Sequence, residues 1–274
     1  QRRLPLPSRQ RERRGGPLMS SIREMASSCI LGISLLVGTA LPSLPVVATR
    51  ECSPSMAFCD SSLDETTRVR DLIRRLTNPE KLFQLTNHGA GIRRLGIPAF
   101  EYWTEALHGV AHSQGVKFGG DYPFATSFPQ VTTSAASFDR HMWRRIGSAV
   151  STEVRAFHNA GRAGLTVWTP NINVVRDPRW GRSQETPGED PYVASVYAVE
   201  YVRGLQKGDD RRYAKVAATC KHYTAYDMDS WNGTDRHHYD AIVHPIDLAE
   251  TFLPPFQACV EVADAQSIMC AYNA

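Results

Sequence analysis

The chain has 274 residues, of which 42% are hydrophobic, and a formal net charge of +3. This length and apolar content suffice for one large domain with its own core. The positive charge is confined to residues 1–48, which hold seven Arg and two Glu and leave −2 for the rest of the chain. A body without basic excess argues against nucleic-acid binding.

The first 48 residues have the order of features found in a secretory signal peptide. Arg23 precedes the apolar run Cys29–Leu41, and small residues follow in the cleavage positions. The run is shorter than the roughly 20 apolar residues of a membrane helix. We therefore expect residues 1–48 to be a basic extension with a signal peptide, and 49–274 to be the folded part. An uncleaved anchor helix is the alternative.

Apolar periodicity predicts helices in the first half of the folded part. Apolar residues recur at helical spacing over 64–76, and again from Trp143 to about residue 158. Between these helices, Asn78 and Pro79 predict the cap and first turn of a second short helix. The run Gly96–Phe100 is a strand candidate.

Short apolar runs alternate with helical segments in the second half. Leu165–Trp168, Val216–Cys220 and Ser267–Cys270 predict buried strands. Helices are expected from the Asp190 cap to near Gly208, and over 247–253, where two consecutive prolines stop the helix. This alternation predicts βα units and a parallel sheet.

Polar, charged and aromatic residues follow each predicted strand directly. Glu105 follows the first strand, Arg182 the second, Lys221 and His222 the third, and Tyr272 the fourth. The carboxyl ends of the strands of a (β/α)₈ barrel converge on one mouth, where the active site lies. A doubly wound sheet is the alternative, but its ligand crevice lies between two strands beside a switch point. Four contributing strands favour an α/β fold of the TIM-barrel type.

The residue types at this predicted mouth suit a sugar. Arg179 and Arg182 flank Trp180, and guanidinium groups bind hydroxyls while an indole covers the apolar face of a sugar ring. Lys221 offers a fixed cation, and His222 can donate a hydrogen bond while neutral. A core histidine with a satisfied partner is the alternative for His222.

Metal and nucleotide chemistry have little support in the sequence. His108 and His112 could share a metal on a helix, but Gly109 lies between them and no third ligand is near. Neither a glycine-rich phosphate loop nor a G-x-S-x-G motif occurs. We therefore expect no metal and no cofactor, with a metal-dependent barrel enzyme as a weaker alternative.

Five cysteines remain after the predicted leader: Cys52, Cys59, Cys220, Cys259 and Cys270. Secretion would place them in an oxidising compartment. The first two are close enough in sequence to form a local disulfide, and the odd number predicts a free thiol or a partner elsewhere. A zinc site is the alternative, although no Cys-x-x-Cys pair exists. Asn232 lies in the only Asn-x-Thr/Ser glycosylation sequon.

Seven segments occur in order between about residue 58 and the end of the chain. They are Arg94–Pro98, Tyr102–Gly109, Thr126–Gln130, Thr169–Asn173, Arg176–Pro191, Lys221-His222 and Ser267–Asn273. Together they resemble glycoside hydrolase family 3, most of all its β-xylosidase and α-L-arabinofuranosidase branch from plants and fungi. The segment Arg176–Pro191, with its Asp-Pro-Arg-Trp-Gly-Arg run, is the most specific of the seven.

The resemblance implies a (β/α)₈-like first domain, incomplete in this chain, and a second α/β sandwich domain. It implies a retaining mechanism with an Asp nucleophile and a Glu acid/base. In the family the nucleophile follows the Tyr-Asn segment on a later strand, and the acid/base lies in the second domain. Both are therefore expected beyond residue 274, and none of the carboxylates present takes their place.

The resemblance also assigns glycone-binding roles to six residues: Glu105, Trp168, Arg182, Lys221, His222 and Tyr272. Glu105 corresponds to the carboxylate that holds sugar hydroxyls, Trp168 to the aromatic wall, and Tyr272 to the Tyr beside the nucleophile. A charge at position 105 is not expected in a core, so Glu105→Ala should weaken pentose binding more than folding.

The implied activity belongs to the full-length parent, which would release terminal non-reducing β-D-xylosyl or α-L-arabinofuranosyl residues from plant-wall oligosaccharides. The chain itself is expected to be an inactive, glycone-binding part of that enzyme. A non-catalytic carbohydrate-binding pseudoenzyme is the alternative. We expect an extracellular protein, in the cell wall or apoplast, with no membrane contact after signal cleavage and no nucleic-acid partner.

Overall fold

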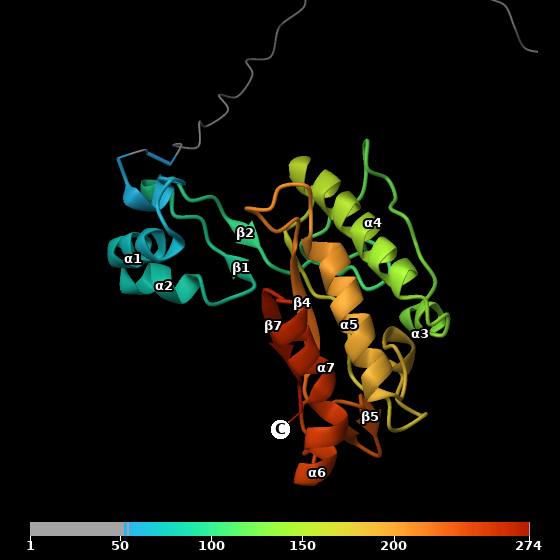
Figure 1. The fold of residues 1–274 in the computed structure, drawn as a ribbon. Helices are drawn as coiled ribbons and strands as arrows, with labels where there is room; N and C mark the ends of the chain where they lie inside the picture. The colour runs from blue at the N-terminus through green and yellow to red at the C-terminus, as the bar shows by residue number, and fades with distance from the viewer. Residues whose placement is uncertain (1–51, 54, 274) are drawn as a thin grey trace, which may run out of the picture. The chain divides into compact units, whose positions relative to one another are not determined.

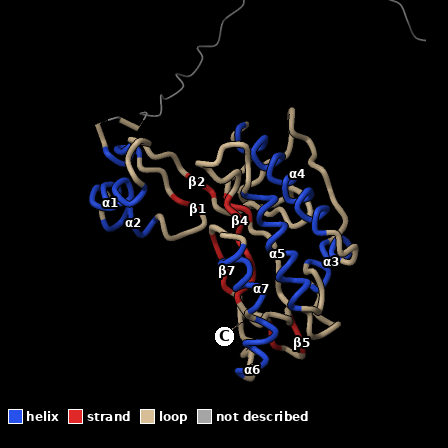
Figure 2. Tube along the Cα trace, viewed as in Figure 1, coloured by secondary structure: helices blue, strands red, loops and turns tan. Residues whose placement is uncertain are grey.

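The computed structural model describes residues 52–53 and 55–273, which belong to a compact unit formed by residues 47–274. The predicted leader over 1–48 lies outside the described residues. Within this unit, helices α4 and α5 run side by side next to the strands β4 and β7 (Figures 1 and 2).

The elements follow one another in an order of helices and short strands. The helical segments are η1 (Ala57–Cys59), α1 (Glu65–Arg75), α2 (Asn78–Phe83), η2 (Arg93–Leu95), α3 (Val131–Ala135), α4 (Arg140–Asn159), η3 (Ser183–Glu185), α5 (Pro191–Gln206), α6 (Pro245–Asp247), η4 (Leu248–Phe252), α7 (Pro254–Gln257) and η5 (Ala258–Val262). The strands are β1 (His88–Gly89), β2 (Phe100–Glu101), β3 (Thr166–Val167), β4 (Ala217–Tyr223), β5 (Ser230–Trp231), β6 (Thr234–Asp235) and β7 (Ser267–Cys270).

Three strands form the parallel sheet that carries the predicted mouth. Their order is β3-β4-β7, and both pairings are parallel. Helix α5 connects β3 to β4, and the segment from α6 to η5 connects β4 to β7. A parallel bridge from Thr104 to Val167 extends the sheet by one position beyond β3. The predicted βα units and the three strands are therefore confirmed, but β7 is only partly buried and its last residue, Cys270, is exposed.

Helices α4 and α5 pack together unusually closely. Asp139 and Asp190 cap them by accepting hydrogen bonds from the third backbone N–H that follows each cap. At their crossing, a Cβ on Gly147 would lie 2.6 Å from the carbonyl oxygen of Tyr201, and a Cβ on Gly204 would lie 2.2 Å from that of Arg144. Only glycine permits this approach, which brings the aromatic and aliphatic faces of both helices into the main core.

The first part of the described chain has a small core of its own, formed by Phe58, Ile92 and Leu95 beside helix α1. The predicted local disulfide between Cys52 and Cys59 closes this part. The predicted cap of α2 is wrong by one residue. Thr77 is the cap, and it exchanges hydrogen bonds with Glu80 in a capping box, so Asn78 already belongs to the helix.

The predicted strand over Gly96–Phe100 is also wrong. Gly96 has a left-handed φ of 71° and ends η2, which turns the chain back so that Ile97 bridges to Ile92. The strand that follows, β2, pairs antiparallel with β1 and lies outside the parallel sheet. The residue that joins the parallel sheet just before Glu105 is Thr104, which forms a parallel bridge with Val167.

The predicted stop at Pro254 and Pro255 does not occur. Neither proline has an N–H for the helical ladder, but the π-helical segment η4 bridges the gap with a bond from Leu253 N–H to the carbonyl of Leu248. The prolines then occupy the first positions of α7, where no N–H is needed. The helical segment therefore continues to Val262.

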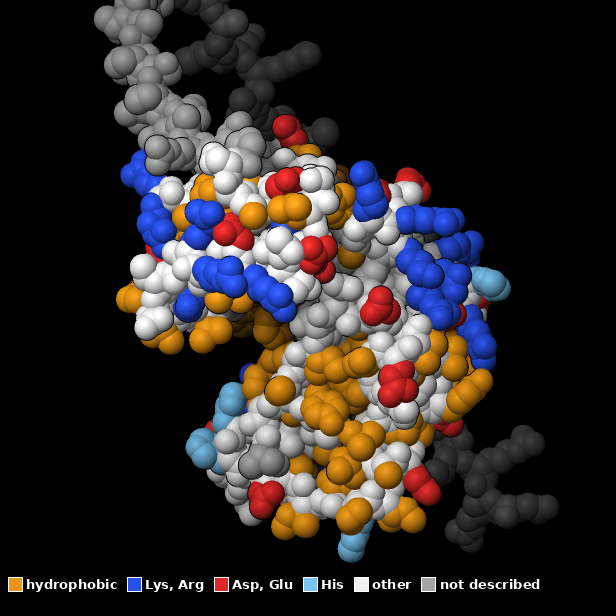
Figure 3. Space-filling view, turned by 60° about the vertical axis from the view of Figure 1, so that its left-hand side comes forward, with side chains coloured by type: hydrophobic (Ala, Val, Ile, Leu, Met, Phe, Trp, Pro, Cys, Tyr) orange, Lys and Arg blue, Asp and Glu red, His pale blue; other side chains and the backbone are white. Residues whose placement is uncertain are grey.

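A second disulfide joins Cys220 of β4 to Cys259 of η5, so the sheet and its helical layer are covalently linked. Cys270 is exposed and has no disulfide partner among the described residues, which is one of the two outcomes that the odd cysteine number allowed. In the part of the chain that follows Pro245, three apolar side chains are exposed: Ile246, Val260 and Val262. Figure 3 shows hydrophobic side chains gathered over a wide part of one face. Within residues 52–53 and 55–273, no helix has the length and apolar character that crossing a membrane requires.

Candidate functional site

An ion pair joins Glu105, which follows the sheet position of Thr104, to Lys221 of β4, on the other side of β3. The Lys221 ammonium lies 2.8 Å from Oε2 of Glu105, and the Lys221 side chain is only 2% exposed, against 27% for Glu105. Burial lowers the pKa of Lys221, while the attraction and hydrogen bond of Glu105 act in the opposite direction. The second oxygen of Glu105 accepts a hydrogen bond of 3.1 Å from the indole of Trp103. The carboxylate is thus held from both sides.

Two indoles lie beside this ion pair. The rings of Trp103 and Trp168 are 6.4 Å apart and tilted by 41°. The indole N–H of Trp168 donates to the carbonyl of Tyr102, which fixes Trp168 against the loop that carries Glu105. Trp103 is 43% exposed, so one aromatic surface next to the ion pair faces solvent. Such a surface can cover the apolar face of a sugar ring.

His222 is the next residue after Lys221, and it is wholly buried. The pairing of β4 with β7 is irregular between Lys221 and Tyr223, which breaks the usual alternation of side chains and lets both Lys221 and His222 point inward. Nδ1 of His222 lies 3.0 Å from Oδ1 of Asn173, which also accepts a bond from the His222 backbone N–H. Nδ1 therefore carries the hydrogen.

The other ring nitrogen of His222, Nε2, has no hydrogen-bond partner among the described residues. Burial lowers the pKa of His222 to about 2, and the positive charges of Arg182, Lys221 and Arg236 act in the same direction. The ring is therefore neutral, its Nδ1 donates to Asn173, and Nε2 is left as an acceptor. Neither a protonated imidazole nor metal binding is needed to explain its position.

Arg182 and Tyr272 complete the cluster around His222. Arg182 forms a two-pronged ion pair with Glu185, at 2.9 and 2.7 Å, and its guanidinium lies 5.7 Å from the ring centre of Tyr226. Burial alone would lower the pKa of Arg182, but the bonds to Glu185 outweigh it and raise the pKa. The ring of Tyr272 lies 5.4 Å from both His222 and Tyr226. All these groups are therefore fixed by neighbours before any ligand arrives.

The six predicted residues thus gather in two adjoining groups that meet at the Lys221-His222 peptide. Glu105, Trp168 and Lys221 form one, and Arg182, His222 and Tyr272 the other. The sequence did not assign supporting roles to the residues that hold them: Trp103, Asn173, Glu185, Tyr226, Asp229 and Arg236. Trp103, Asn173 and Glu185 lie within three of the seven segments that carry the resemblance. Tyr226 could have been noticed, because it follows Lys221-His222 within the same polar and aromatic run.

Within the described part of the chain, no group of three or more His, Cys, Asp or Glu side chains is arranged to hold a metal ion. His108 and His112, the pair considered from the sequence, are engaged separately. Nδ1 of His108 lies 2.8 Å from the carbonyl of Phe128, and His112 packs against the ring of Phe118 at 4.9 Å.

The sequence of residues 78–274 matches the model of the glycosyl hydrolase family 3 N-terminal domain. The chain belongs to glycosyl hydrolase family 3. Beta-D-xylosidase 1 of Arabidopsis thaliana is 54% identical over 220 residues, which are 80% of this chain and 28% of that protein. Beta-xylosidase/alpha-L-arabinofuranosidase 2 of Medicago sativa subsp. varia is 52% identical over 230 residues, which are 83% of this chain and 30% of that protein.

A solved structure supports the same assignment. The GH3 exo-beta-xylosidase XlnD, in complex with a xylobiose aziridine activity-based probe, matches with a TM-score of 0.77 and 42% identity, over 82% of this chain and 29% of that chain. The fold is therefore TIM-barrel-like, and the predicted barrel class is confirmed over a doubly wound sheet. The chain spans about three tenths of the length of these relatives.

Proposed function

We propose that the two adjoining groups form the glycone-binding half of a retaining β-xylosidase. The substrate would be a xylo-oligosaccharide with a terminal non-reducing β-D-xylosyl unit, and an α-L-arabinofuranosyl unit is the second pentose to test. The observation that supports this most directly is the Glu105–Lys221 pair beside an exposed indole. A carboxylate and an ammonium 2.8 Å apart can accept from one sugar hydroxyl and donate to its neighbour.

No carboxylate around the site is assigned to bond cleavage. Glu105 is paired with Lys221, Glu185 with Arg182, and Asp229 with Arg236. A nucleophile of a retaining glycosidase must reach the anomeric carbon, and an acid must hold a proton for the leaving group. These three carboxylates are each engaged by a cation, and the family resemblance places both catalytic carboxylates later in the sequence, so we propose that the nucleophile and the acid/base belong to segments beyond residue 274 in the parent enzyme.

The test uses the 274-residue chain with an aryl β-xyloside and with a xylobiose aziridine probe. We expect no release of the aryl group above buffer and no covalent labelling, while methyl β-D-xyloside still binds. Lys221→Met should abolish the part of that binding that occurs at the Glu105–Lys221 pair, because the ammonium is the donor held at the centre of the site. Labelling of any carboxylate in this chain would contradict the assignment of both catalytic groups to later segments.

We further propose that the protein is secreted and works in the cell wall or apoplast. The disulfides Cys52–Cys59 and Cys220–Cys259 support this, because such bonds persist in oxidising compartments. Asn232 is exposed in the turn between β5 and β6, where a glycosyltransferase could reach it. Expression in a secreting host should give a glycan mass that Asn232→Gln removes. Intracellular retention with reduced cysteines would contradict the proposal.

A further inference from the structure

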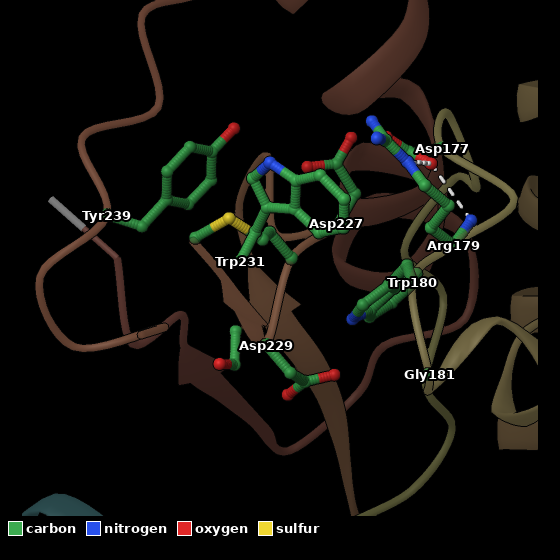
Figure 4. A pocket seen from close by; sticks show the side chains of 10 residues that line it. Asp177, Arg179, Trp180, Gly181, Asp227, Asp229, Trp231 and Tyr239 are labelled. Atoms are coloured by element: carbon green, nitrogen blue, oxygen red, sulfur yellow. Dashed lines mark hydrogen bonds and ion pairs between the residues drawn. The ribbon is translucent and has the colours of Figure 1, made fainter. Parts of the chain in front are cut away.

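A pocket of about 230 Å³ lies next to the candidate site but outside it. One side is the turn from Asp177 to Gly181, and the other is the segment from Asp227 to Tyr239, which includes strand β5 (Figure 4). Trp180 separates the pocket from the site, since its ring packs edge-to-face on Tyr226 at 5.3 Å. Tyr226 in turn contacts His222 on the site's side. Asp229 lines the pocket and also holds Tyr226 and Arg236, but none of the six predicted glycone-binding residues lines the pocket.

The charges of the pocket are mixed. Asp177, Asp227 and Asp229 line it together with Arg179. Arg179 is bonded to Asp177, but Asp227 has no ion-pair partner within the described residues. Burial raises the pKa of Asp227, and the negative charge of Asp177 adds to this effect. Three carboxylates disfavour an anionic ligand, and together with the guanidinium of Arg179 they offer a neutral polar ligand both acceptors and a donor.

The pocket also presents aromatic surface. Trp231 is 59% exposed, and the guanidinium of Arg179 lies 4.6 Å from its ring centre. Figure 4 shows the Trp231 indole in the middle of the pocket, between Tyr239 on one side and Arg179 and Trp180 on the other. An exposed indole with carboxylate acceptors and a guanidinium donor around it matches the chemistry of a polyhydroxylated ring, whose faces are apolar and whose edge both donates and accepts.

We propose that this pocket is a second saccharide-binding site, which takes one neutral sugar ring and is separate from the glycone-binding half. Its volume is below the roughly 300–1,000 Å³ of pockets that enclose drug-sized ligands, so it fits one ring and not an oligosaccharide. The ring lies against Trp231, donates hydroxyl hydrogens to Asp227 and Asp229, and accepts from Arg179. In the parent enzyme such a site would hold a sugar chain near the catalytic mouth.

The test measures binding of methyl β-D-xyloside to the 274-residue chain by calorimetry or saturation-transfer NMR, in a Lys221→Met background that removes the glycone-binding half. We expect binding to persist in this background and to weaken at least about tenfold when Trp231→Ala is added. Trp231→Phe should retain most of the affinity. Gly181→Leu should also block binding, because a Cβ at Gly181 meets no atom within 4 Å and the added side chain can enter the pocket.

Tyr213→Ala is the matched control. Trp231 lies against Arg179, which is paired with Asp177. Tyr213 is 57% exposed and lies in the same way against Arg212, which is paired with Asp210. This control should bind the glycoside unchanged. Loss of all binding in Lys221→Met, with normal binding in Trp231→Ala alone, would overturn the second site and leave the proposed function intact. If wild type and Lys221→Met bind the glycoside equally, and Trp231→Ala abolishes this binding, the second site is supported and the proposed glycone-binding half is overturned.

Discussion

Replacing Glu105 by Ala should reduce the stability of the fold as well as sugar binding. The sequence suggested a larger loss in binding than in folding, because a charge at this position was not expected in a core. In the structure the carboxylate is the counter-ion of Lys221, whose side chain is 2% exposed. Glu105→Ala leaves that ammonium buried without a partner.

The magnitude follows from the burial of the two partners. Removing one member of a buried ion pair typically costs about 3–5 kcal/mol. The Glu105 side chain is 27% exposed, so water can partly replace it, and we expect the lower end, about 3 kcal/mol. The double variant Glu105→Ala/Lys221→Met should recover much of this loss, because an apolar side chain of similar length carries no charge to desolvate.

The pH dependence gives an independent signature. The folded-state pKa of Lys221 is lowered, first by burial, so between that pKa and about 10.4 the unfolded chain binds more protons than the folded one. Stability therefore rises with pH across this window. Loss of Glu105 removes the attraction and the hydrogen bond that raise the pKa of Lys221, so this pH window should extend to lower pH. The destabilisation caused by Glu105→Ala should therefore shrink as the solution becomes alkaline and Lys221 loses its charge.

The assay is urea unfolding of the 274-residue chain at neutral and alkaline pH, followed by circular dichroism. Asp210→Ala is the control, because it breaks an ion pair with Arg212 at 3.0 Å in which both side chains are exposed, and it should leave the midpoint almost unchanged. A Glu105→Ala chain as stable as this control at every pH would refute the reasoning, and Lys221 would then not be a buried cation held by Glu105.

Two further predictions concern the same strand. The pKa of His222 is about 2 in the folded chain and about 6.5 in the unfolded chain, so the free energy of unfolding should fall as the pH drops below about 6.5, by about 2 kcal/mol at pH 5. His222→Gln should flatten this pH dependence in urea titrations. The Cys220–Cys259 disulfide spans 39 residues, so Cys259→Ser should cost up to about 4 kcal/mol in thermal or urea unfolding. Cys270→Ser is the control, and a loss of similar size there would show that the disulfide is not the cause.

The elements that could be predicted are those whose signal is local. Helices α1, α4 and α5 follow from apolar periodicity and from capping carboxylates such as Asp190, and β3, β4 and β7 follow from short apolar runs. The two-residue strands β1 and β2 are too short to leave a pattern. The continuation through Pro254 and Pro255 depends on a π-helical turn, which no propensity of the individual residues indicates.

The candidate site also has a part that the sequence predicts and a part that it does not. The order of elements predicts that polar groups gather at the strand ends, but it does not predict which of these groups contact one another. Glu105 and Lys221 are 116 positions apart, and their 2.8 Å contact arises because Thr104, β3 and β4 are consecutive positions of one sheet. Lys221 and His222 both point inward because the strand pairing is irregular between Lys221 and Tyr223, but they contact different partners. One becomes a cation held by a distant carboxylate and the other a neutral ring held by Asn173, so the chemistry of each follows from the fold around it and not from its neighbour in sequence.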